Sequence, residues 1–395
     1  MKKRKLVLPL MSILLLTACG EGDNNQSNNE ESESKEVISL WANGSDNVRR
    51  AFESVAEKFN QSEYGQDYEL EIQFITSGTG VQGLADRVLA AKNAGETETD
   101  YDLITLSDAQ FTMYTEEGGD DFFKQLNSDL LSNDDKLTTE VSIGEEYLLP
   151  YRGTTVVLAY DSESVDSVPE TSESLYQWII DNPSRFAYNT PNSGGAGQSF
   201  VETSIYNFLP EEAMTSSDES WKEEWDQGFD LLKELHPYLY ESGGEVVYPN
   251  KNQGTLDLLA NKQVDMIPAW ADMVIQQKTE GVLPESIEIT QIDPALTGNL
   301  DAIAMPEVGG ASEEGAHAVM DFFLSEDAQQ ILLDEMAAIP LIDSENMESP
   351  NAEMLENLDT SEFRAISIGG LATDLQEIWE QEIASLTSSV EPVTE

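Results

Sequence analysis

The sequence predicts an α/β protein with two lobes, each a mixed sheet flanked by helices, joined by extended hinge segments. Two observations favour this fold. Short apolar runs alternate with amphipathic segments from Val37 onward, which is typical of sheets covered by helices. This alternation occurs in two series, the second beginning near Thr154, and a chain of 395 residues suits two domains of ordinary size.

The first series predicts a mostly parallel sheet. Its helix at 45–59 places Val48, Phe52, Val55 and Phe59 on one face. The elements in order are a strand at 37–42, that helix, a strand at 69–76, a helix through 84–89 and a strand at 101–107. A β-α-β-α-β order places consecutive strands parallel, with the helices on the faces of the sheet.

The second series begins with the apolar, β-branched run 154–160, which predicts a buried strand. Strands are then expected at 185–189, 264–268, 287–292 and 300–305, and helices near 174–181, 199–208, 220–235, 313–324 and 327–336. We therefore expect one lobe from 37–153 with about 302–345, and a second from 154–301. Residues 346–395 are expected to form a helical segment that packs on the lobes.

The N-terminus has the pattern of a secretory signal. Four basic residues precede an apolar run that ends in Leu16-Thr17-Ala18-Cys19, which resembles the lipobox of bacterial lipoproteins. We expect cleavage after residue 18, acylation of Cys19 and a solvated tether over 19–36, which would hold the protein on the extracytoplasmic face of the cell membrane. The alternative is an uncleaved anchor, but Leu6 to Ala18 is shorter than the ~20 residues that a bilayer requires.

Charge excludes one class of partner. The first 18 residues hold four of the 20 basic residues and none of the 76 acidic ones, which leaves 16 against 76, a formal balance of −60. Nucleic-acid binding depends on lysine and arginine, so this balance argues against it. It favours adaptation to salt or alkaline conditions, where self-repulsion is screened; the alternative is an ordinary anionic surface protein.

Candidate binding residues lie in five loops that follow predicted strands, where α/β proteins bind ligands. They comprise two tryptophans, glycines that expose backbone amides, and small or acidic polar residues. They are Trp41, Asn43, Ser45, Ser77, Gly78, Thr79, Asp108, Ser193, Gly194, Gly195, Trp270 and Asp272. Each loop alone is also compatible with an ordinary turn, and each tryptophan with a core position.

Arg152 is the most distinctive single residue, because it is one of few basic residues and immediately precedes the predicted strand 154–160. It could bind an anionic part of a ligand or form a salt bridge with a carboxylate. Asp108 and Asp272 offer the opposite option of pairing with a cationic group. Asp301 begins the predicted return strand, where a turn is the expected role.

No constellation of catalytic residues stands out. His236 and His317 lie in neither metal-ligand nor triad-like settings, and the chain has no HExxH, GxSxG, CxxC or P-loop motif. We expect no cofactor and no metal. An acidic pair for glycoside hydrolysis stays open, since the chain is rich in Asp and Glu.

Several segments resemble the extracellular solute-binding proteins of bacterial ABC importers, in the branch of thiamine, ferric iron and polyamine binders. The segments are the lipobox and tether, 37–45, 149–160, 187–199 and 300–306. The resemblance implies a type II periplasmic-binding-protein-like fold whose two lobes close on a small solute by a hinge motion. It also implies a monomer that delivers the solute to an ABC permease, and no enzymatic activity.

The resemblance implies a solute such as a thiamine-like compound, a polyamine or another small organic molecule. Trp41 and Trp270 could stack on a ring, with Arg152 and the amide loops available to an anionic part. No adjacent tyrosines lie in a loop, which disfavours iron. A surface scaffold or adhesion lipoprotein is the main alternative, and an exported hydrolase is a weaker one.

Overall fold

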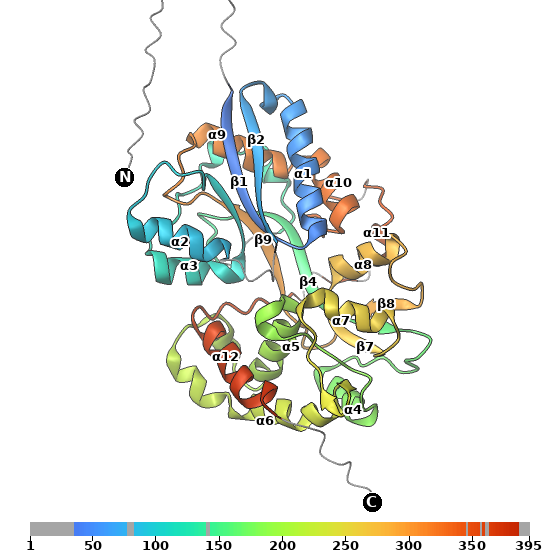
Figure 1. Cartoon of the computed structure of the whole chain (residues 1–395). Coiled ribbons are helices and arrows are strands. Elements are labelled where there is room, and N and C mark those ends of the chain that lie inside the picture. Colours follow the sequence, from blue (N-terminus) through green and yellow to red (C-terminus); the bar gives the residue numbers. More distant parts are fainter. Residues whose placement is uncertain are drawn as a thin grey trace, which may run out of the picture. The chain divides into compact units, whose positions relative to one another are not determined.

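A seven-stranded mixed sheet organises the chain (Figure 1). The computed structural model describes residues 35–76, 83–139, 143–344, 347–355, 358–359 and 363–386. The strand order is β2-β1-β3-β9-β4-β7, and β8 also pairs with β4. The strands are β1 (Glu36–Gly44), β2 (Tyr68–Thr76), β3 (Leu103–Ser107), β4 (Leu149–Asp161), β7 (Met266–Trp270), β8 (Ile287–Thr290) and β9 (Gly298–Ala304). A separate hairpin pairs β5 (Glu241–Ser242) with β6 (Glu245–Val246).

The strand β4 connects the two parts of the sheet. Its first half pairs antiparallel with β9, from Leu149 to Thr155. Its second half pairs with β7 and β8, from Val156 to Asp161. All thirteen of its residues are buried, which explains the run of apolar and β-branched residues at 154–160 in the sequence. The mixed sheet that the sequence predicts is therefore confirmed.

The first core forms where the predicted β-α-β-α-β order is realised. The strands β1, β2 and β3 are parallel, and α1 (Asp46–Gln61) and α2 (Leu84–Ala94) connect them. The α1 residues Val48, Phe52, Val55 and Phe59 are at most 5% exposed, as their spacing predicts. Two later helices, α9 (Glu313–Phe323) and α10 (Glu326–Met336), pack on α1 and complete this first core.

Serines begin both of these later helices. The side chain of Ser312 accepts a hydrogen bond from the Gly315 amide, and that of Ser325 accepts one from the Ala328 amide. Such caps satisfy amide groups that have no partner within the helix. The predicted helices at 313–324 and 327–336 are confirmed to within one residue at each end.

The second core surrounds the C-terminal half of β4. Its helices are α4 (Ser172–Asp181), α5 (Gly195–Tyr206), α6 (Asp226–Leu235) and α12 (Leu371–Trp379). Leu375 and Trp379 of α12 are buried with Phe200 of α5 in one hydrophobic cluster. The Trp379 indole also donates a hydrogen bond to the Tyr188 hydroxyl, at 3.1 Å. The C-terminal helix is thus an integral part of this core.

Other helices cover the remaining surfaces of the sheet. They are α3 (Phe111–Gly118), α7 (Lys251–Ala260), α8 (Ala271–Thr279) and α11 (Ala352–Leu355). The sequence did not predict α3, α7 and α8, whereas α11 lies within the segment 346–395 that was expected to be helical. Three of them, α3, α7 and α8, have weak amphipathic patterns, so the apolar period is hard to read in the sequence.

The predicted strand at 185–189 is wrong. This segment makes only an isolated bridge, between Phe186 and Met266. The Arg185 carbonyl accepts hydrogen bonds from the amides of both Asp265 and Met266, and the Phe186 carbonyl accepts one from the Tyr240 amide. The backbone groups of Arg185 and Phe186 are therefore satisfied by two separate segments, the start of β7 and the residue Tyr240 before β5, and not by continuous pairing with one strand.

Candidate functional site

A cavity of about 810 Å³ is lined by residues of both cores. It lies at the carboxyl ends of β1, β3 and β7, the location at which α/β sheets bind ligands. The residues that line it and bear on the argument are Asn43, Ser45, Asp46, Glu117, Arg152, Ser193, Gly194, Gly195, Gln198, Glu202, Asn252, Trp270, Asp272, Asp301, Ile366 and Ile368.

Most of the predicted binding residues that the structure describes line this cavity. They are Asn43, Ser45, Arg152, Ser193, Gly194, Gly195, Trp270 and Asp272. Ser77, Gly78, Thr79 and Cys19 lie outside the described residues. Sequence reasoning missed Gln198, Glu202 and Asn252. The first two lie on the inward face of a helix, and only their i, i+4 spacing after a glycine-rich loop could have indicated them.

Trp41 and Asp108 do not line the cavity. The Trp41 indole donates a hydrogen bond to the Asp100 carbonyl at 2.9 Å, and its ring packs against that of Tyr101. Asp108 is 4% exposed, in a short 3₁₀ turn after β3. The expected pair of tryptophans around one ligand is therefore not what the structure has, and Trp270 is the one of the two that lines the cavity.

Arg152 is held by two carboxylates. Its Nη2 lies 2.6 Å and its Nε 2.7 Å from Asp301 Oδ2, because Arg152 and Asp301 are opposite each other on β4 and β9. Its Nη1 lies 3.3 Å from Asp272 Oδ2, at the start of α8. The arginine is 7% exposed. The salt bridge, one of the two roles expected for Arg152, is therefore present, and protein carboxylates balance the charge of the arginine.

Burial and neighbouring charges shift the pKa values of Arg152 and Asp272 in opposite directions. These two residues and Asp301 are called the triad below. Burial alone would lower the pKa of Arg152, but the charges of Asp301 and Asp272 outweigh it and raise the pKa. Burial raises the pKa of Asp272, although the Arg152 charge opposes that change. The three residues together leave one negative charge on this wall of the cavity.

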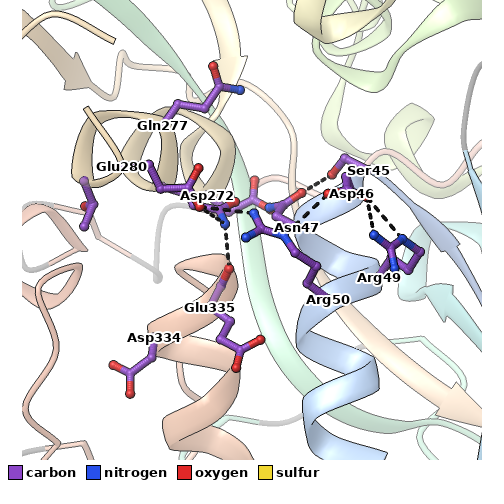
Figure 2. Close-up of polar contacts among 12 residues, drawn as sticks. Ser45, Asp46, Asn47, Arg49, Arg50, Asp272, Gln277, Glu280, Asp334 and Glu335 are labelled. Carbon is purple, nitrogen blue, oxygen red and sulfur yellow. Dashed lines mark hydrogen bonds and ion pairs between the residues drawn. The ribbon is translucent and has the colours of Figure 1, made fainter. Parts of the chain in front are cut away.

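Helix α1 reaches the same triad (Figure 2). The Asn47 side-chain amide lies 3.5 Å from Asp272 Oδ2, and Asn47 Oδ1 accepts a hydrogen bond from the Ser45 hydroxyl. Further along, Arg50 of α1 pairs with Glu280 at 3.1 Å, just after α8. These contacts join an element of the first core to one that follows β7.

Two backbone amides after the glycine-rich loop are bonded to asparagine side chains. The side chain of Asn252 accepts a hydrogen bond from the Ala196 amide at 3.2 Å, and that of Asn189 accepts one from the Gly197 amide at 2.9 Å. Gly197 permits this arrangement, since a Cβ there would lie 1.9 Å from the Asn189 carbonyl oxygen. Amides that are already bonded to asparagine cannot also hold an anion, so the amides of Ala196 and Gly197 do not contribute to an anion site.

Trp270 and Glu202 define two other features of the cavity. A Cβ on Gly195 would lie 2.8 Å from the Trp270 ring, so a glycine at this position lets the indole pack against the start of α5. Glu202, on the same helix, is 5% exposed and accepts a hydrogen bond from Gln198 Nε2 at 2.6 Å. Burial raises the pKa of Glu202 to about 7, against the opposing effect of that hydrogen bond.

The described residues contain neither a metal-binding cluster nor a membrane-spanning helix. No three histidine, cysteine or carboxylate side chains among the described residues are grouped so that they could hold a metal ion. Within the same part of the chain, no helix is both long and apolar enough to cross a bilayer.

Comparisons with known proteins identify the fold and the family. The chain is similar to an ABC transporter chain from Clostridium perfringens ATCC 13124 (TM-score 0.62, 14% identity, 87% of this chain and 98% of the other). It is also similar to a periplasmic thiamin binding protein (TM-score 0.62, 13% identity, 88% and 95%). A third similar structure is a solute-binding protein from Thermotoga lettingae TMO bound with α-D-tagatose (TM-score 0.65, 12% identity, 89% and 95%).

These similar structures are two-lobed binding proteins, and this confirms the predicted fold class. The comparison with curated proteins finds no match. The family model for bacterial extracellular solute-binding proteins matches residues 54–358, which is most of the chain. The chain therefore belongs to the bacterial extracellular solute-binding protein family, whose members serve ABC transporters.

Proposed function

We propose that this protein captures a small organic solute in the cavity lined by both cores and delivers it to an ABC permease. The cavity itself is the observation that carries the proposal. Its volume of about 810 Å³ suits a small molecule, and the half-exposed indole of Trp270 offers an apolar surface for stacking. Asn43, Ser45 and Ser193 supply hydrogen-bonding groups around it.

The arrangement of charges limits the kind of solute. Arg152 is neutralised by Asp272 and Asp301, and the amides of Ala196 and Gly197 are bonded to asparagine side chains. Arg152 and these two amides are therefore already engaged within the protein, and Lys251 is the other basic side chain among the residues that line the cavity. In this proposal Arg152 and Asp272 hold the wall of the site in place, and Trp41 and Asp108 have no direct role in binding.

We propose that the two cores belong to lobes that close on the solute. The first lobe comprises 37–153 with about 302–345, and the second comprises 154–301, with 346–395 packed on them. The strands β4 and β9 run from one core to the other, so small changes along them would act as the hinge. In this scheme the contacts of α1 with α8 change when the cavity closes.

We propose that the mature chain begins at Cys19, is acylated there and works as a monomer. The tether 19–36 would hold the binding protein near its permease on the extracytoplasmic face. No catalytic step belongs to this proposal, because a binding protein releases its solute unchanged.

The test combines a binding measurement with small-angle scattering. A compound that stabilises the protein against heat should also reduce its radius of gyration, since closure compacts the two lobes. Trp270→Ala should weaken that binding by at least ~1 kcal/mol, the value of one lost stack. Stabilisation without compaction, or unchanged affinity in the variant, contradicts the proposal.

A further inference from the structure

The carboxylates that line the cavity differ in how the protein balances their charge. Asp272 and Asp301 share Arg152, and Asp46 pairs with Arg49 and Arg50. Glu117 is exposed to solvent, which stabilises its charge. Each of these groups therefore has a cation or solvent beside it, although Asp272 and Asp301 share one cation and Asp272 Oδ1 is buried without a hydrogen-bond partner.

Glu202 is the exception. It is 5% exposed, and no basic residue in the described part of the chain forms an ion pair with it. Its hydrogen-bond partner is Gln198 Nε2, one turn earlier on α5. A single neutral amide does not replace the hydration that a carboxylate loses on burial, and the raised pKa of Glu202 reflects that loss.

A buried carboxylate without a cation costs stability, and a glutamine of the same shape would avoid that cost. The cavity beside Glu202 is where a compensating charge can enter, because the side chain lines it. We propose that Glu202 and Gln198 form a subsite for a positively charged nitrogen, so that the solute is a basic organic compound. This inference rests on the proposed function of the cavity.

The surroundings of the subsite suit such a compound. Ile366 and Ile368, which precede α12, line the same cavity and are 7% and 2% exposed. These side chains, with the Trp270 ring, provide apolar contacts for the carbon skeleton of the solute. A cation next to a buried carboxylate forms a charge-assisted hydrogen bond, which is among the stronger polar contacts in proteins.

The experiment measures binding of defined probes by thermal shift at mildly alkaline pH and low salt. The basic probes are putrescine, choline and thiamine, and the others are tagatose, which is neutral, and succinate, which is anionic. Three proteins are compared: the unmodified protein, Glu202→Gln, and Glu117→Gln as a matched control in which an exposed cavity carboxylate is changed. The glutamine variant keeps the shape of the side chain and is expected to fold.

We expect at least one basic probe to bind the unmodified protein, and its affinity to fall at least ~10-fold in Glu202→Gln and less than about threefold in Glu117→Gln. Equal affinity in the unmodified protein and Glu202→Gln overturns the inference. Binding of tagatose or succinate without any basic probe also overturns it, while the proposed function stands. Failure of all five probes to bind contradicts the inference and the proposed function together.

Discussion

Replacing Glu202 by glutamine should make the protein more stable, and the gain should grow with pH. The physical reason is that Glu202 is buried without a cation, so its pKa rises from 4.5 in the unfolded chain to about 7 in the folded protein. A carboxyl whose pKa is higher in the folded protein than in the unfolded chain does not destabilise the protein below the pKa of the unfolded chain. The free energy of unfolding then falls as the pH rises from 4.5 to about 7. Glutamine does not ionise and escapes that loss.

The magnitude follows from the difference between the two pKa values. One pKa unit corresponds to about 1.4 kcal/mol, so the full penalty above pH 7 is about 3 kcal/mol. At about pH 5.5 only the first part of the titration has occurred, and the penalty is about 1 kcal/mol. Glu202→Gln should therefore gain about 1 kcal/mol at the lower pH and about 3 kcal/mol at about pH 8.5.

The assay is urea unfolding of the ligand-free protein and the variant at these two pH values. The lower value stays above the isoelectric point near 4.1, where low net charge favours precipitation. Only the difference between the two proteins is interpreted, because the other carboxylates titrate in both. Glu117→Gln is the control, and its exposed position predicts a change within about 0.5 kcal/mol. A gain for Glu202→Gln that does not increase with pH, or a loss of stability, would refute the reasoning.

Three further predictions follow from the site and from the charge. Arg152→Met should lower the unfolding free energy by about 3–5 kcal/mol, because it leaves Asp272 and Asp301 buried without a cation; a loss below about 1 kcal/mol in urea unfolding contradicts this. Gly197→Ala should cost about 1–3 kcal/mol, since its Cβ would overlap the Asn189 carbonyl, and an unchanged melting temperature speaks against that contact. The urea midpoint should rise between about 0.1 M and about 2 M NaCl as self-repulsion is screened, and a flat or falling midpoint excludes salt adaptation.

Local pattern was sufficient to predict much of the fold. The spacing of Val48, Phe52, Val55 and Phe59 predicts α1, and the apolar run at 154–160 predicts the buried strand β4. The apolar residues of 185–189 resemble those of a strand, yet the backbone of this segment bonds to two separate segments, at the start of β7 and before β5. Strand pairing is a property of distant segments, and a local pattern does not contain it.

The sequence predicts which loops line the cavity, but it does not predict which charged residues are paired. The loops after strands could be recognised, because chain direction determines at which end of the sheet they lie. The role of Arg152 was open, since its two partners lie 120 and 149 residues further along the chain. Glu202 was missed for a similar reason: in a chain with 76 acidic residues, only burial distinguishes it from the rest.

The central claim is that the cavity beside Trp270 holds one small solute. Native mass spectrometry tests it most directly, by weighing the purified protein after incubation with yeast extract and buffer exchange. We predict one small molecule bound per chain, and its loss from Trp270→Ala under the same conditions. An unmodified protein that retains no small molecule, or a variant that retains it equally well, would contradict the claim.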